Sequence, residues 1–132
     1  MTTVTKKTVL VIEDHPGLRS LLTDVFTMNG YQVTAVANGL EGHERAKEGG
    51  YSAIICDIKM PAMDGITFLK VLQENPAKIP NGPIIMYSNF AYEYSKDEVL
   101  ALGAAEFIAK DTIATGELVE RVNKLLIQTT TG

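Results

Sequence analysis

Four apolar stretches of the 132-residue sequence end in side chains that can bind a metal or a phosphate: Glu13 with Asp14, then Asp57, Ser88 and Lys110. Asp57 follows two isoleucines and a cysteine, and a lone carboxylate in such surroundings costs free energy unless a cation or solvent meets it. Clustered carboxylates repel one another, and hard oxygen ligands with room for water suit Mg²⁺, with Mn²⁺ as a possible substitute. These residue types indicate a cation site, provided that the fold brings them together.

A lysine beside such a cluster indicates that the site could also bind a phosphoryl group. The ammonium of Lys110 and one Mg²⁺ would balance three carboxylates and neutralise the oxygens of a phosphoryl group. Aspartate is a known covalent phosphoryl acceptor, so Asp57 could attack the phosphorus in line. The pattern therefore favours phosphoryl transfer onto a carboxylate.

Each of these residues also has an ordinary structural role open to it. Glu13 and Asp14 precede Pro16 and could simply cap a helix. Ser88 could be a loop hydroxyl, and Lys110 could be a solvated strand end. A shared site explains all of these positions together only if the strands that carry them are neighbours.

Hydrophobic periodicity predicts five strands that alternate with five helices. The predicted strands are short apolar runs at 8–14, 31–37, 52–57, 83–88 and 105–110. Helical spacing follows each run, over Leu18 to Phe26, 40–48, Ile66 to Leu72, Ser95 to about Gly103, and Leu118 to Leu126. Ser95 with Glu98 predicts a capping box, and Thr115 is the predicted N-cap of the last helix.

This alternation predicts an α/β fold, namely a five-stranded parallel sheet covered by helices on both faces. The common solution is the flavodoxin-like, doubly wound (βα)5 sandwich with strand order 2-1-3-4-5. In that order the first, third, fourth and fifth strands are neighbours, and ligands bind at the carboxyl ends of such strands. The second strand lies outside this row and ends in 35–37 without an ionisable group.

Length and composition narrow the class of protein. A chain of 132 residues fits one domain, and 45% hydrophobic with 21% charged residues is typical of a globular protein. The net charge of −4 leaves no basic surface for nucleic acid or for an anionic membrane. A single cysteine excludes an internal disulfide, and no apolar run suits a membrane span or a secretion signal. We therefore expect a cytoplasmic location.

Four motifs make the sequence resemble the receiver domain of two-component response regulators: VIEDH, CDIKMPAMDG, MYS and EFIAK. The second motif is the most specific, because it closely matches the family pattern D-x-x-M-P-x-M-D-G. The resemblance covers 8–128, which we expect to be the domain, with flexible segments at 1–7 and 129–132.

The resemblance implies a metal site and a phosphoryl acceptor. Asp57 would be the residue that a sensor histidine kinase or a histidine phosphotransfer protein phosphorylates. Glu13, Asp14 and Asp57 would hold Mg²⁺ together with the backbone carbonyl of Lys59. The domain would not be an enzyme beyond catalysing its own phosphorylation and dephosphorylation.

The resemblance also implies a switch. Ser88 and Lys110 would contact the phosphoryl oxygens, and Phe107 would be the aromatic residue that turns inward when the Ser88 hydroxyl is drawn to the phosphate. The switch would change binding to a downstream protein or an output domain. From the residues alone, an ordinary core aromatic is the favoured interpretation of Phe107.

The sequence departs from the family pattern in two places. Asn89, followed by Phe90, stands where a small residue usually follows the hydroxyl. Asp111 stands where proline usually follows the lysine, in a peptide bond that is cis in the family. Because a cis bond costs roughly 2.5 to 4 kcal/mol without proline, we predict a trans bond here, with Lys110 pointing into the acidic crevice and Asp111 facing outward.

Other functions stay open at this point. A haloacid-dehalogenase-type phosphatase needs a second aspartate where Lys59 stands, and a flavin-binding domain needs a different loop from DHPGLRS. A pseudo-receiver would serve only as a binding module. The Lys110-Asp111 pair also resembles regulators with a LuxR-type output, so the chain could be the receiver half of one.

Overall fold

The computed structural model describes residues 6–89 and 91–130. Phe90 lies outside these ranges, as do 1–5 and 131–132 of the predicted flexible ends. The first strand, β1 (Lys7–Ile12), begins one residue before the predicted start of the domain at residue 8. The last helix, α5 (Thr115–Thr130), ends two residues after the predicted end of the domain at residue 128.

Five parallel strands form one sheet in the order β2-β1-β3-β4-β5, which confirms the predicted fold. The other strands are β2 (Tyr31–Val36), β3 (Ala53–Cys56), β4 (Ile84–Ser88) and β5 (Glu106–Ala109). The helices before α5 are α1 (Pro16–Met28), α2 (Gly39–Ala46), α3 (Gly65–Glu74) and α4 (Lys96–Ala101), and a short 3₁₀ turn, η1 (Ala91–Glu93), was not predicted.

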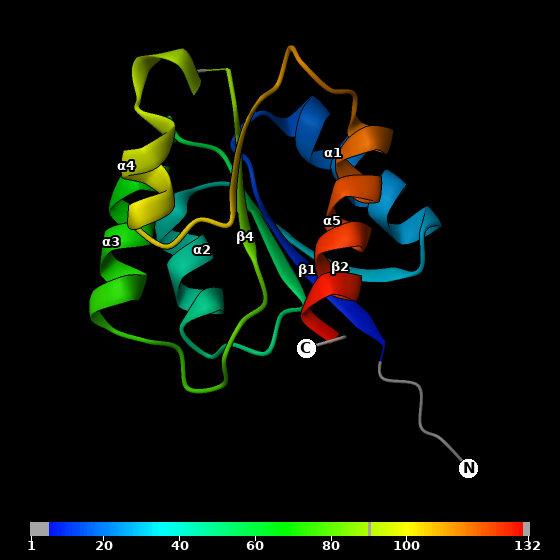
Figure 1. Cartoon of the computed structure of the whole chain (residues 1–132), viewed down its shortest axis with the longest axis horizontal. Coiled ribbons are helices and arrows are strands. Elements are labelled where there is room, and N and C mark those ends of the chain that lie inside the picture. The colour runs from blue at the N-terminus through cyan, green and yellow to red at the C-terminus, as the bar shows by residue number, and fades with distance from the viewer. Residues whose placement is uncertain (1–5, 90, 131–132) are drawn as a thin grey trace.

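The helices cover the two faces of the sheet unequally, with α2, α3 and α4 on one face and α1 and α5 on the other (Figure 1). Alternate residues of each central strand therefore enter different cores. In β1, Val9 and Val11 pack under α1 and α5, whereas Leu10 and Ile12 pack under the other three helices. Burial on both faces explains why these strands read as continuous apolar runs.

The first residues of the helices show which polar side chains act as N-caps. His15, not Asp14, caps α1, because its Nδ1 accepts a hydrogen bond from the amide of Leu18 at 3.2 Å. Ser95 caps α4 as predicted, with its hydroxyl accepting from the amide of Glu98 at 3.4 Å. The prediction for Thr115 is wrong by one residue, since Thr115 is already the first residue of α5.

The connection from β3 to α3 folds back tightly over the end of β3. Gly65 donates its amide to the carbonyl of Ile58 at 2.6 Å, and a Cβ on Gly65 would lie 2.1 Å from the carbonyl oxygen of Asp57. Asp64 caps α3 by accepting from the amide of Thr67 at 2.7 Å. The absence of a side chain at Gly65 thus lets the start of α3 pack directly against the backbone of Asp57.

Among the described residues, no helix combines the length and the apolar character that crossing a bilayer requires.

Candidate functional site

The carboxyl ends of the four neighbouring strands β1, β3, β4 and β5 meet at one edge of the sheet. A cleft of about 540 Å³ opens there, and it is lined by Glu13, Asp14, His15, Pro16, Leu18, Asp57, Lys59, Asn89 and Lys110. The cleft therefore brings together the acidic residues and the lysine that the sequence placed at separate strand ends.

Three carboxylates approach one another closely in this cleft. One oxygen from each of Glu13, Asp14 and Asp57 lies within 4.8 Å of the others. Glu13 and Asp57 are buried, with 2% and 6% of their surfaces exposed, whereas Asp14 is exposed. The cluster thus has two buried carboxylates in the wall of the cleft and one exposed carboxylate at its mouth.

Lys110 is the cation that meets the two buried carboxylates. Its Nζ lies 2.8 Å from Glu13 Oε1 and 2.9 Å from Asp57 Oδ2, and only 12% of its side chain is exposed. Burial alone would lower the pKa of Lys110, but its hydrogen bonds to Glu13 and Asp57 outweigh burial and raise that pKa above its ordinary value. Lys110 therefore stays charged at neutral pH.

The surroundings of Glu13 disfavour its charged form, whereas those of Lys110 favour the charged ammonium. Burial raises the pKa of Glu13, the hydrogen bond from Lys110 lowers it, and the negative charge of Asp57 raises it again, so that the net shift is upward. The upward shift means that one lysine does not fully compensate the buried acids. An additional cation near Glu13 would relieve this cost.

Backbone contacts fix Asp57 and Lys110 in place. Asp57 Oδ1 accepts from the amide of Ile58 at 2.7 Å, which leaves Oδ2 for Lys110. The amide of Asp57 donates to Ile12 at 3.0 Å, and the amide of Lys110 donates to Ser88 at 3.0 Å. Each residue thus extends the sheet by one further hydrogen bond beyond its strand.

The loop that carries Glu13 and Asp14 is held by Arg19, a residue that sequence reasoning missed. Arg19 Nη1 donates to the carbonyl of Glu13 at 2.9 Å and to that of Asp14 at 3.2 Å. Glu13 Oε2 also accepts from the amide of His15 at 3.1 Å. Because His15 provides the cap of α1, the side chain of Asp14 is not used for capping and makes no hydrogen bond or ion pair with the described residues.

Two predicted site residues, Ser88 and Phe107, are not among the residues that line the cleft. Ser88 is fully buried at the end of β4. Phe107 is half-buried in β5 and packs against the core under α2, α3 and α4. Lys59 and Asn89 line the cleft, and the Lys59 ammonium lies 3.1 Å from Glu93 on the surface.

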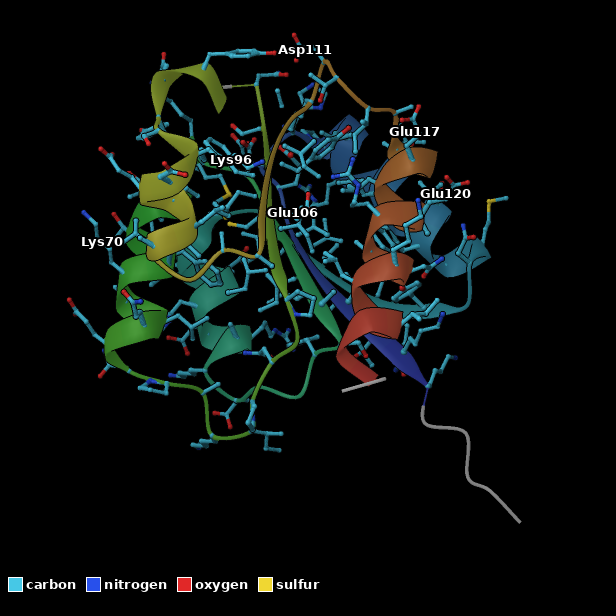
Figure 2. All side chains as sticks on the ribbon, in the orientation of Figure 1. Lys70, Lys96, Glu106, Asp111, Glu117 and Glu120 are labelled. Atoms are coloured by element: carbon cyan, nitrogen blue, oxygen red, sulfur yellow. The ribbon has the colours of Figure 1, made fainter. Side chains whose placement is uncertain are left out.

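The connection from β5 to α5 confirms the prediction for the Lys110–Asp111 bond, where the sequence lacks the proline of the family pattern. The Lys110–Asp111 peptide bond is trans, as are all peptide bonds within the described ranges. The Lys110 side chain enters the acidic cleft, whereas Asp111 is exposed and accepts a hydrogen bond from the hydroxyl of Tyr92 at 3.3 Å. Figure 2 shows Asp111 at the outer tip of this connection, away from the sheet.

The donor set fits a hard divalent cation. Its atoms are carboxylate oxygens, which Mg²⁺ prefers, and the exposed position of Asp14 leaves room for water ligands that Mg²⁺ usually keeps. With one lysine among three carboxylates, the cluster keeps a double negative charge that a divalent ion would balance. The acidic pocket is therefore compatible with Mg²⁺ binding.

Comparisons with known proteins agree with this geometry. The family model described as the response regulator receiver domain matches residues 9–123. The chain is 34% identical over 119 residues to the chemotaxis protein CheY of Bacillus subtilis, an alignment that covers 89% of this chain and 96% of CheY.

Solved structures extend the similarity to three dimensions. The receiver domain of the Francisella response regulator 1452 has a TM-score of 0.81 and 30% identity, over 93% of this chain and 98% of that one. The response regulator TrrA of Thermotoga maritima, solved in complex with Mg²⁺-BeF, has a TM-score of 0.75 and 28% identity, over 90% of this chain and 98% of that one.

Other relatives are longer than this chain. A protein-glutamate methylesterase/protein-glutamine glutaminase of Archaeoglobus fulgidus is 36% identical over 121 residues, which are 89% of this chain but only 34% of that enzyme. The family match over most of the chain and the full-length similarity to CheY agree on one assignment. The chain belongs to the response regulator receiver domain family.

Proposed function

We propose that Asp57 accepts a phosphoryl group from a phosphohistidine, carried by a sensor histidine kinase or a histidine phosphotransfer protein. The observation that carries this proposal is the position of Asp57 at the centre of the cleft. One oxygen of its carboxylate lies within 4.8 Å of an oxygen from each of two further carboxylates, and Lys110 forms an ion pair with it.

The transfer would be an in-line displacement at phosphorus. A carboxylate oxygen of Asp57 forms the new P–O bond while the P–N bond to the donor histidine breaks. The histidine nitrogen keeps the electron pair of that bond and, with a proton on the other ring nitrogen, leaves as neutral imidazole. The product is an acyl phosphate on Asp57.

The residues around Asp57 would stabilise the negative phosphoryl oxygens. Lys110 already bonds Asp57 Oδ2, so its ammonium can turn to a phosphoryl oxygen without leaving the cleft. The buried Ser88 hydroxyl, at the end of the neighbouring strand, would donate to another. Glu13, Asp14, Asp57 and the backbone carbonyl of Lys59 would hold Mg²⁺ (or Mn²⁺), which when bound supplies further positive charge to these oxygens.

Ser88 and Phe107 would convert phosphorylation into a change of surface. Ser88 ends β4, and its neighbour β5 pairs Ser88 with Ala109, two residues after Phe107. Phe107 is half-buried and lines a hollow beside η1 and α4, so it has room to change its exposure. Movement of Ser88 toward the phosphoryl group would free space for Phe107 to turn inward, and the altered surface would be recognised by a downstream protein or an output domain.

The length of the relatives bears on the downstream partner. The chain spans nearly all of CheY and about a third of the methylesterase. Both a separate target protein and an output domain on a longer chain therefore agree with the comparisons. We propose 8–128 as the domain that carries the activity in either case.

Phosphorylation of Asp57 can be measured by intact mass after incubation with Mg²⁺ and acetyl phosphate. Wild type should gain the mass of one phosphate, and Asp57→Asn should gain none. Asp111→Asn is the matched control, because Asp111 is the carboxylate next to Lys110 that faces outward, and it should be modified like wild type. A wild type left unmodified both by acetyl phosphate and by phosphorylated kinase would refute the proposal.

The metal site can be tested by thermal unfolding of Asp14→Asn. Without metal, removing one of three repelling carboxylates should raise Tm by about 2 to 5 °C. With Mg²⁺, wild type should gain stability because the ion binds only the folded chain, whereas Asp14→Asn should lose most of this gain. Asp111→Asn should keep it; equal Mg²⁺ responses in all three proteins would contradict the metal site.

The switch can be tested by hydrogen exchange in Phe107→Ala. In wild type, phosphorylation should change the protection of β4, β5 and the connection between them. The variant should be phosphorylated at close to the wild-type rate, because Phe107 does not line the acidic cleft, but it should lose most of that change. An unaltered exchange response in phosphorylated Phe107→Ala would assign Phe107 to the core alone.

A further inference from the structure

The five-residue connection between β5 and α5 carries the lysine of the site without the proline that the family pattern has after it. Two hydrogen bonds close a turn that contains Lys110 and Asp111, because both the amide and the hydroxyl of Thr112 donate to the carbonyl of Ala109, at 3.0 and 2.7 Å. These bonds fix the start of the connection. They do not fix its far end, at Ile113, which leads into α5.

Tyr87 reaches that far end from β4. Its hydroxyl donates to the carbonyl of Ile113 at 3.0 Å, and only 3% of the residue is exposed. Tyr87 and Ser88 are consecutive strand residues, so their side chains point to opposite faces of the sheet, and the Tyr87 ring packs in the core under α1 and α5. A tyrosine in such a core combines a large apolar body with one polar group, and here the polar group binds the connection.

The end of β4 thus holds the connection at both of its ends. The carbonyl of Ser88 accepts from the amide of Lys110, and the hydroxyl of Tyr87 donates to Ile113. Between these anchors the trans Lys110–Asp111 bond sends one side chain into the cleft and the other to solvent.

We propose that Tyr87 is a positioning residue for Lys110. Its hydroxyl holds the connection on the trans path that places the ammonium 2.8 Å from Glu13 and 2.9 Å from Asp57. The effect on phosphoryl transfer rests on the function proposed for Asp57, whereas the effect on the position of Lys110 does not.

Tyr87→Phe tests this inference, because it removes the hydroxyl and keeps the ring in the core. Tyr31→Phe is the matched control: Tyr31 is equally buried, and its hydroxyl bonds Asn123 of α5, but it stands at the opposite end of the sheet from the cleft. Both variants lose one buried hydrogen bond to the α5 side, so their unfolding temperatures should fall by similar amounts.

Two measurements on the full chain separate positioning from stability. The first is the rate at which a limiting dose of acetic anhydride acetylates Lys110, read by peptide mass spectrometry. The second is the rate of phosphorylation by saturating acetyl phosphate and Mg²⁺. Tyr87→Phe should speed the first and slow the second by about tenfold, the factor that one lost hydrogen bond of ordinary strength can produce, and Tyr31→Phe should change neither.

Thr112→Val provides a second variant should Tyr87→Phe prove unstable. It removes the hydroxyl bond to Ala109 at the start of the connection, and it should shift both rates in the same directions. Acetylation and phosphorylation rates in Tyr87→Phe that equal those of Tyr31→Phe would overturn the inference, and so would an unchanged acetylation rate with slower phosphorylation. A wild type that is never phosphorylated would instead refute the proposed function, while the acetylation rates would still decide whether Tyr87 holds Lys110.

Discussion

The ammonium of Lys110 bridges two buried carboxylates, Glu13 and Asp57, and so links the residues that follow β1, β3 and β5. Breaking a buried ion pair by removing one partner typically costs about 3 to 5 kcal/mol, so loss of the lysine should destabilise the folded chain. The third carboxylate, Asp14, is left without a cation among the described residues. The same contact therefore stabilises the folded chain and leaves it with the negative charge that a divalent ion would balance.

The fold supplies the positions that this contact requires. Four neighbouring parallel strands end at one edge, and Gly65 lets the start of α3 pack against the backbone of Asp57. Arg19 holds the backbone of the loop that carries Glu13 and Asp14. Both supports act through backbone atoms and occupy none of the carboxylate oxygens of the cleft.

Periodicity predicted the parallel sheet, with its strand order taken as the common one for such a fold, and residue type predicted the four charged residues Glu13, Asp14, Asp57 and Lys110 that meet in the cleft. Both follow from rules that act along short segments, because apolar runs identify parallel strands and polar residues at their ends identify the ligand-binding edge. The supports were not predictable in this way. The roles of Arg19 and Tyr87 depend on hydrogen bonds to backbone carbonyls, which any residue offers, and the bond from Tyr87 spans 26 positions. The cap of α1 was not identified for a related reason, since Asp14 and His15 both precede this helix and either can accept the same bond.

A divalent cation bound in this cleft would share the charge of the three carboxylates with Lys110. Calorimetric titration of Mg²⁺ into wild type and Lys110→Met tests it most directly, with circular dichroism to confirm that the variant is folded. Removing the lysine frees oxygens of Glu13 and Asp57 and increases the negative charge, so Mg²⁺ should bind on the order of tenfold more tightly. Unchanged or weaker Mg²⁺ binding by a folded Lys110→Met would contradict the claim.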